Sequence, residues 1–293
     1  MLSQKSNKAV SSYLKQSFHR FKNVELSQDF AETYFSQGMN SALNMVDRVR
    51  GELGNNFKPK AILEIGCAGG FNCFALSERF PEAKIYGVEP EKSGVELGQL
   101  LTDELNVSGK VSIKQGFGEE LPYADGFFDL IICHTVIEHV QNVDAVITEV
   151  ARVLSPKGVF HIEAPNYIFP YEPHLRIVTI PLLGKKFVAF TSLLQGKGSQ
   201  NGYLGHLQFV TPFWLEKLFN NLSLEYENRA LAKLKLAASG KTKIMKFKLL
   251  ANMLRAMAYL KLTKPAIWLV STIGFYPSVM YTVRRKTSSP HHT

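Results

Sequence analysis

Between residues 60 and 164 the chain alternates short apolar runs with longer stretches of helical spacing. Short apolar runs bounded by Gly, Pro or polar residues predict strands, and the amphipathic stretches between them predict helices. The expected strands cover residues 61–65, 84–88, 111–114, 128–133 and 159–162, and the expected helices cover residues 71–80, 91–105 and 143–154. Strands that alternate with helices form parallel sheets covered on both faces. This region therefore predicts an α/β fold.

Three further regions surround this core. Residues 1–59 have helical apolar spacing and predict an N-terminal cap. Residues 165–210 lose the regular alternation and are rich in Pro, Gly and aromatic residues, which predicts a long insertion after the fifth strand. In residues 211–293 we expect a helix opening at Thr211, two strands that complete the sheet, and a basic helical insertion between those strands over residues 231–262. We expect Ser155 to Gly158 to stop the preceding helix.

The composition is that of a globular protein, with 45% hydrophobic and 20% charged residues among 293. The three cysteines, Cys67, Cys73 and Cys133, are too scattered for a disulfide framework or a zinc site, so a reducing compartment fits best. The first 24 residues contain no apolar run long enough for a signal peptide. We therefore expect a cytoplasmic protein.

The net charge of +9 is unevenly distributed. Residues 25–227 carry 16 basic and 25 acidic residues, whereas residues 1–24 and 228–293 carry basic residues and no acidic ones. A nucleic-acid enzyme would line its main cleft with Lys and Arg. The acidic body therefore makes nucleic acid an unlikely partner, unless the basic C-terminal segment binds it.

Two features follow the first two expected strands. Residues 64–70, Glu-Ile-Gly-Cys-Ala-Gly-Gly, join a strand to a helix, and small residues there allow a ligand to approach the backbone closely. The spacing does not fit the dinucleotide fingerprint GxGxxG, because Ala68 and Phe71 occupy its second and third glycine positions. Glu89 ends the second strand, where a carboxylate can accept hydrogen bonds from both hydroxyl groups of a ribose.

Residues 64–70 resemble motif I of class I S-adenosylmethionine-dependent methyltransferases, E/DxGxGxG, with Ala68 in place of the middle glycine. Residues 119–123, 126–131, 137–140 and 149–158 resemble, in order and spacing, the "type 11" family of these enzymes, which includes quinone-biosynthesis and other small-molecule methyltransferases. The resemblance covers about residues 60–165. It implies a Rossmann-like, mainly parallel sheet of seven strands with helices on both faces, a helical N-terminal cap and insertions after strands five and six.

The same resemblance implies that S-adenosyl-L-methionine is the cofactor and indicates where it binds. The loop would contact its methionine part, Glu89 its ribose, and residues 116–119 its adenine, with Phe117 where the family often has an Asp. The implied cofactor-binding residues are Glu64, Gly66, Cys67, Ala68, Gly70, Glu89, Pro90, Phe117, Gly118, Glu119 and His134.

Methyl transfer to a hydroxyl group is helped by a general base. His134 ends the fourth strand, and His139, preceded by Glu138, is expected at the start of the next helix, where packing or capping is an equally good interpretation. His134, His139 and His174 are our candidate catalytic residues. Some quinone O-methyltransferases of the family carry a Glu-x-x-Glu-His metal set here, but Thr135 stands at the position of its first Glu. We therefore expect no metal ion.

The insertion supplies candidates for acceptor binding, because Tyr, Glu and His gather just beyond the fifth strand. The alternative interpretation is a loop packed by its own aromatic side chains. The candidate substrate-binding residues are Asn166, Tyr167, Tyr171, Glu172 and His206. The family implies a small-molecule acceptor or a lipid-linked acceptor of glycan or quinone type.

Residues 229–264 interleave lysines with aliphatic residues, which predicts docking on an anionic membrane, on its inner face. The alternative is that this helix packs its apolar face on the domain. The following uncharged residues 265–283 are near the length of a membrane span, but Gly274 and Pro277 interrupt them, and we expect a short helix and a strand. Two other functions stay open: methylation of RNA or protein through the basic segment, and a non-catalytic S-adenosylmethionine-binding relative.

Overall fold

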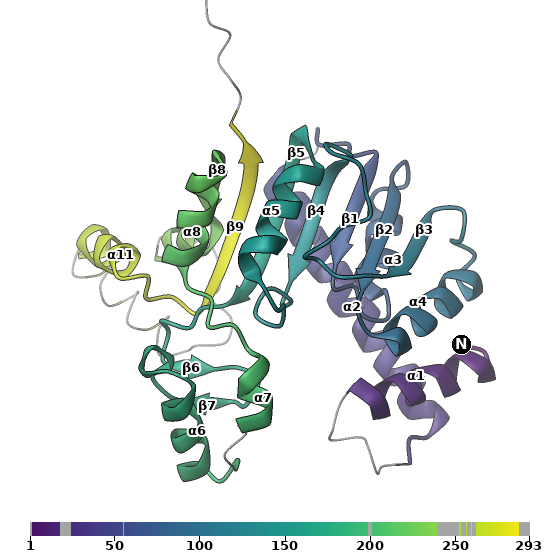
Figure 1. Cartoon of the computed structure of the whole chain (residues 1–293), viewed down its shortest axis with the longest axis horizontal. Coiled ribbons are helices and arrows are strands. Elements are labelled where there is room, and N and C mark those ends of the chain that lie inside the picture. The colour runs from purple at the N-terminus through teal and green to yellow at the C-terminus, as the bar shows by residue number, and fades with distance from the viewer. Residues whose placement is uncertain are drawn as a thin grey trace, which may run out of the picture. The chain divides into compact units, whose positions relative to one another are not determined.

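A computed structural model gives the structure of the chain (Figure 1). It describes residues 2–17, 25–54, 56–198, 201–238 and 262–286, together with the single residues 252, 256 and 259. Among these residues, no helix is both long enough and apolar enough to cross a membrane.

Seven strands form one sheet in the order β3-β2-β1-β4-β5-β9-β8. Their bounds are β1 Ala61–Ile65, β2 Lys84–Glu89, β3 Val111–Gln115, β4 Phe128–His134, β5 Leu154–Pro165, β8 Leu224–Asn228 and β9 Ser278–Arg285. β1 pairs in parallel with β2 and β4, and β2 pairs in parallel with β3, whereas β9 runs antiparallel to β5 and β8. This mainly parallel seven-stranded sheet confirms the predicted fold class.

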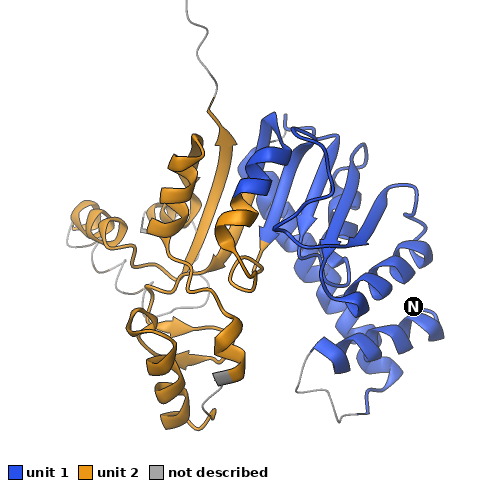
Figure 2. Cartoon of the chain, in the orientation of Figure 1, with its two compact units in different colours: residues 1–133, 148–159 blue, residues 134–147, 160–293 orange. Residues whose placement is uncertain are grey.

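The chain divides into two compact units (Figure 2). Unit 1 comprises residues 1–133 and 148–159, and unit 2 comprises residues 134–147 and 160–293. The boundary passes through β5 and through helix α5, Val143–Val153. Each unit is therefore described by itself.

Unit 1 contains the first three strands, β4 up to Cys133, and the helical N-terminal region. Its complete helices are α1 Gln4–Ser17, α2 Gln28–Leu53, α3 Phe71–Arg79 and α4 Lys92–Glu104. The Ser27 hydroxyl accepts a hydrogen bond from the backbone N–H of Phe30 and so caps α2. α2 packs against α3 and α1 packs against α4, so the N-terminal helices share the hydrophobic core of the sheet.

Unit 2 contains the insertion and the last two strands of the sheet. Its further elements are β6 Tyr171–Glu172, β7 Ile177–Val178, the 3-10 helix η2 Pro181–Leu183, α6 Lys185–Leu194, α7 Asn201–His206, α8 Pro212–Asn221, α9 Arg229–Ala238 and α11 Thr263–Thr272. The Thr211 hydroxyl accepts a hydrogen bond from the Trp214 N–H and caps α8, as its sequence predicts. Leu204 and Leu207 join Val188 and Ala189 in a small separate core.

Two local predictions are wrong. The fifth strand was expected only from residue 159, after a stop at Ser155 to Gly158, but β5 begins at Leu154 directly after α5 and includes these residues. Gly158 suits this strand because a Cβ there would lie 2.7 Å from the carbonyl oxygen of Phe128. His139 lies in a turn that precedes α5, closed by its N–H bonding to the Val136 carbonyl. The helix begins later because the Asn142 side chain accepts a hydrogen bond from the Ala145 N–H.

Candidate active site

The small-residue loop between β1 and α3 has the left-handed backbone that its sequence suggests. Gly66, Ala68 and Gly70 have φ angles of 69°, 48° and 85°. The N–H groups of Gly66 and Cys67 both donate to the carbonyl oxygen of Val88, which ties the loop to β2. The loop is therefore held in a defined shape directly before the first turn of α3, whose N–H groups favour a polar or anionic ligand.

Glu89 ends β2 and faces this loop. One carboxylate oxygen accepts the Ala68 N–H at 2.7 Å, and the other accepts the Glu91 N–H at 2.9 Å. Each oxygen uses one lone pair in these bonds and keeps another for a ligand hydroxyl group. The side chain is buried, and burial raises its pKa. The carboxylate therefore has the position and free acceptor capacity that ribose binding requires.

Glu64 and the two nearby cysteines lie beneath the loop. Glu64 is buried and accepts hydrogen bonds from the Asn72 amide at 2.5 Å and from the Cys73 thiol at 3.2 Å. The neighbouring Cys67 thiol and burial both raise the pKa of Cys73, which is therefore an inert thiol. These contacts indicate that Glu64 and Cys67 shape the loop from inside.

The predicted adenine-binding residues follow β3. Phe117 forms a bridge with Glu120 and leaves 51% of its side chain exposed, so its ring can cover a planar ligand. Gly118 is buried, Glu119 is half-buried, and Pro90 is exposed. All predicted donor-site residues except His134 therefore lie in unit 1, and their chemistry fits S-adenosylmethionine.

His134 belongs to unit 2 and ends β4. Its Nε2 lies 3.3 Å from a carboxylate oxygen of Glu163 on β5. The next residue, Thr135, has a φ of 54°, which is strained for a β-branched side chain, and its N–H donates to the Glu163 carbonyl at 2.7 Å. Strained backbone of this kind often marks functional sites. Neither Glu163 nor this strain is apparent from the sequence pattern.

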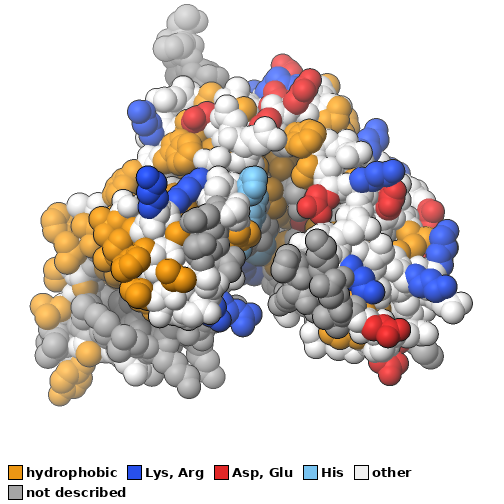
Figure 3. Space-filling view, turned by 60° about the horizontal axis from the view of Figure 1, so that its bottom comes forward, with side chains coloured by type: hydrophobic (Ala, Val, Ile, Leu, Met, Phe, Trp, Pro, Cys, Tyr) orange, Lys and Arg blue, Asp and Glu red, His pale blue; other side chains and the backbone are white. Residues whose placement is uncertain are grey.

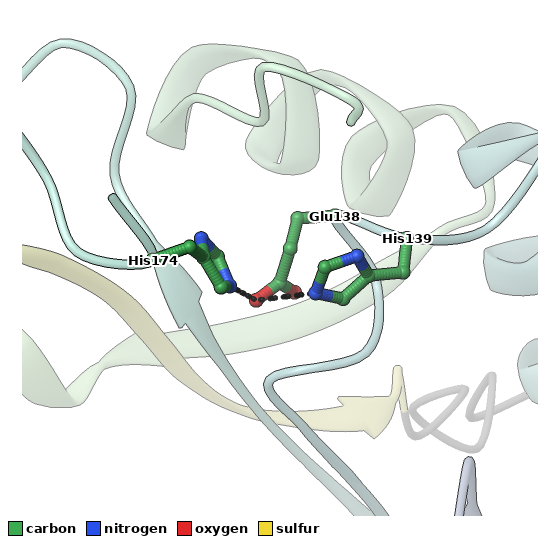
Figure 4. A group of neighbouring side chains, drawn as sticks. All are labelled: Glu138, His139 and His174. Atoms are coloured by element: carbon green, nitrogen blue, oxygen red, sulfur yellow. Dashed lines mark ion pairs between the residues drawn. The ribbon is translucent and has the colours of Figure 1, made fainter. Parts of the chain in front are cut away.

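A second group of titratable side chains surrounds Glu138 (Figure 4). Glu138 is fully buried, and neither of its carboxylate oxygens has a hydrogen-bond donor among the described residues. His174 Nε2 lies 3.7 Å and His139 Nε2 lies 3.9 Å from the same Glu138 oxygen. Burial raises the pKa of Glu138 to about 7. The carboxyl group is therefore poised to exchange a proton near neutral pH.

Glu172 holds His174 from its other side. Its carboxylate lies 2.6 Å from His174 Nδ1 and also accepts the Leu175 N–H at 2.6 Å. The Tyr167 hydroxyl donates to the same carboxylate at 3.5 Å. Burial alone would lower the pKa of His174, but the bond to Glu172 and the charges of both glutamates raise it. A carboxylate at Nδ1 leaves Nε2 of the imidazole for other chemistry.

His139 completes the group. Its ring meets that of His174 edge to face, with centroids 5.0 Å apart, and burial together with the charge of His174 lowers its pKa to about 4. The donor atoms of Glu138, His139 and His174 lie within 4.8 Å of one another, so these side chains could hold a divalent cation. The absence of a metal ion stays a prediction. Turnover that survives treatment with a chelator would support it.

The structure separates the candidate acceptor-binding residues. Tyr167 is buried and stacks on Phe209 at 4.4 Å, beside Glu172. Tyr171 is half-buried on β6, and His206 is exposed at the end of α7. The structure corrects our choice of Asn166 as an acceptor-binding candidate. Its amide nitrogen donates to the carbonyls of Gly274 and Tyr276, and its amide oxygen accepts the Ile168 N–H. Its amide is occupied in holding the chain, so we remove it from the acceptor site.

The sequence interpretation selected the histidines and passed over Glu138 as a reactive group. The signal that could have found it is its position between the apolar residues Ile137 and Val140, because a carboxylate flanked by apolar residues is a candidate for burial. Its partner His174 lies far away in the sequence, so the pairing itself needed the structure.

Residues 63–162 match the family described as "Methyltransferase domain". The chain is 36% identical over 100 residues to norajmaline N-methyltransferase from Rauvolfia serpentina, which is 34% of each chain. It is 33% identical over 107 residues to a ubiquinone biosynthesis O-methyltransferase from Azorhizobium caulinodans, which is 36% of this chain and 40% of that one. The chain thus spans well under half the length of these curated relatives.

Among solved structures, the YcgJ protein from Bacillus subtilis is similar, with a TM-score of 0.51 at 18% identity. The match covers 85% of this chain and 100% of that chain. At this identity the likeness concerns the fold alone. Together with the family match it confirms the predicted class I methyltransferase fold.

Proposed function

We propose that this protein transfers the methyl group of S-adenosylmethionine to an oxygen atom of a small-molecule acceptor, because residues 63–162 match the methyltransferase domain family and the sheet has the class I fold. When bound, S-adenosylmethionine would supply a sulfonium methyl group: the acceptor oxygen would bond to the methyl carbon as its bond to sulfur breaks, and a neutral thioether would leave. The loop before α3 and Glu89 hold the donor, and the group around Glu138 serves the acceptor.

The pairing of His174 with Glu172 is the observation that supports an oxygen acceptor. A neutral hydroxyl group is a weak nucleophile, so a base must remove its proton as it attacks, whereas a neutral amine is a good nucleophile and can lose its proton to water after the attack. His174 takes this proton at Nε2, and Glu172 at 2.6 Å from Nδ1 orients the ring and stabilises its charged form. Glu138, 3.7 Å from Nε2, can then accept the proton because its pKa of about 7 is close to neutrality.

The kind of acceptor is suggested by the relatives and by the basic segment of the sequence. Relatives of the matched domain are named as N- and O-methyltransferases of small molecules, among them ubiquinone biosynthesis. We extend the proposal to a lipid-linked acceptor of glycan or quinone type and to a cytoplasmic protein at the membrane surface. Most of the basic segment 229–264 that suggested this lies outside the described residues.

Labelled S-adenosylmethionine incubated with the purified protein and cell extracts, followed by mass spectrometry, tests the proposal. We expect a labelled O-methyl product whose formation falls about 10²–10⁴-fold in His174→Ala and less in Glu172→Gln. Glu225→Gln on the exposed part of β8 is the matched control and should keep full turnover. Donor affinity should stay unchanged in all three variants. Full turnover of folded His174→Ala would reject His174 as the base.

A further inference from the structure

The segment from β7 to the end of α6 exposes a dense set of large apolar side chains. Six of them, each between 48% and 70% exposed, are Ile180, Leu182, Leu183, Phe190, Leu193 and Leu194. Single exposed leucines are normal on protein surfaces, but a contiguous exposed apolar set usually marks an interaction site. We call these six residues the α6 surface.

The α6 surface is not the side by which α6 packs on unit 2. Val188 and Ala189 face inward and join Ile177, Leu204 and Leu207 in a small core. An ordinary surface helix would carry polar residues on its opposite side. The exposed positions of α6 are Lys186, Phe190, Leu193 and Leu194. Most of them are apolar, so the helix carries apolar residues on both sides.

The charges around the α6 surface have one sign. Between Glu172 and Glu216 the sequence contains no Asp or Glu, but it contains Arg176, Lys185, Lys186 and Lys197. Lys185 donates to the carbonyl of Gly205, and Lys186 is exposed. In Figure 3 hydrophobic side chains gather over unit 2, at the left of the view, with Lys and Arg side chains beside them.

We propose that the α6 surface docks this protein on an anionic membrane, with its apolar side chains in the interfacial layer and its lysines among the lipid headgroups. Lysine can extend its ammonium group to headgroups while its aliphatic stem follows the apolar side chains. A nucleic acid fits less well, because single-stranded nucleic acid is bound by stacking on aromatic rings and this surface is mainly aliphatic. The docking deepens the proposed function by naming a location for it, but vesicle binding itself needs neither donor nor acceptor.

Vesicle sedimentation of the full chain tests the inference. We expect binding to vesicles of phosphatidylcholine with about one third phosphatidylglycerol, weaker binding at high salt, and little binding to phosphatidylcholine alone. The triple variant Phe190→Ser/Leu193→Ser/Leu194→Ser should have a partition coefficient at least about tenfold lower than the wild type. Each substitution removes apolar area that the wild type would bury in the membrane. Lys186→Glu should weaken binding mainly at low salt.

Leu194→Ser compared with Leu236→Ser provides a matched pair, since both leucines are exposed in unit 2 but Leu236 lies on α9. Only the first substitution should weaken binding, and both variants should keep the wild-type circular dichroism spectrum and thermal unfolding profile as proof of folding. Failure of the wild type to bind anionic vesicles at low salt would overturn the inference. So would equal binding of the triple variant and the wild type. Self-association that the triple variant abolishes, without vesicle binding, would make a second copy the occupant. A failure of methyl transfer would leave the vesicle result unaffected.

Discussion

At the scale of single residues, the donor site depends most on Glu89. The sequence predicted that this carboxylate ends a strand next to the small-residue loop, and β2 does end at Glu89. The end of a parallel strand next to such a loop is a recurring ligand position. The structure adds that the same carboxylate also holds the backbone of Ala68 and Glu91. Glu89 therefore holds the loop in addition to the donor-binding role that we propose for it, and its position in the sequence alone does not reveal this structural role.

Glu89→Gln should weaken donor affinity about 10- to 100-fold, because a neutral amide replaces an acceptor of charge-assisted hydrogen bonds worth about 1.5–3 kcal/mol. Gln is preferred to Ala since it retains one acceptor oxygen for the loop. Isothermal titration with S-adenosylmethionine measures the change, and Glu96→Gln on the exposed side of α4 is the control. Unchanged affinity in a folded Glu89→Gln protein would place the donor elsewhere.

Glu138 supports a prediction about pH and stability. Burial raises its pKa from 4.5 to about 7, so between these values the folded state keeps a proton that the unfolded state has lost. The group therefore stabilises the fold at low pH, and this contribution is lost as the pH rises through about 7. The loss amounts to up to about 3 kcal/mol.

Glu138→Gln removes this titration. We expect the free energy of unfolding of the variant, relative to wild type, to increase between pH 4.5 and 8 by up to about 3 kcal/mol. Urea unfolding at several pH values measures it. A difference that stays constant with pH would show that Glu138 is ionised in the folded protein and stabilised by His139 and His174.

At the scale of elements, the strands and helices of residues 60–164 were predicted to within one or two residues, except for the fifth strand, which was expected at residues 159–162 and runs from Leu154 to Pro165. Their apolar periods run over whole elements and are bounded by Gly and Pro, so local sequence determines them. β6 and β7 have two residues each, which is too short for any period to be recognised. α6 was missed for a different reason: it carries apolar residues on both sides, so it lacks the amphipathic pattern that indicates a surface helix.

Gly87, in the middle of β2, packs closely against the side chains of Cys67 in the loop and Cys73 on α3. A Cβ there would lie 2.6 Å from the Cys67 sulfur and 3.1 Å from the Cys73 sulfur. Gly87→Ala should therefore destabilise the protein by about 1–3 kcal/mol and displace the donor loop that contains Cys67.

Thermal unfolding and donor titration measure the two effects of Gly87→Ala. Gly109→Ala is the matched control, because a Cβ there would have nothing within 4 Å. That variant should change stability by no more than about 0.5 kcal/mol. Wild-type donor affinity in Gly87→Ala would mean that the strand yields and the loop does not depend on it.

At the scale of the whole molecule, the sequence itself shows how charge is divided along the chain. It did not predict in which unit the candidate donor-binding residues and the candidate proton-transfer residues would lie. The residues with donor-site geometry lie in unit 1, from Gly66 to Glu119, whereas Glu138, Glu172 and His174 all belong to unit 2. Only long-range contacts bring His174 to Glu138, and these depend on the folded insertion.

This division leads to a prediction about the combined variant Glu89→Gln/His174→Ala. If donor binding belongs to unit 1 and proton removal to unit 2, the two substitutions act on different free-energy terms and their effects should add. We expect donor affinity to match that of Glu89→Gln alone. The kcat at saturating donor should match that of His174→Ala alone, about 10²–10⁴-fold below wild type. Titration and steady-state kinetics on the four proteins of the cycle provide both quantities.

A coupling free energy above about 0.5 kcal/mol in donor affinity would mean that His174 also contributes to donor binding. The assignment of roles to the two units would then be wrong, even though each variant alone had behaved as expected.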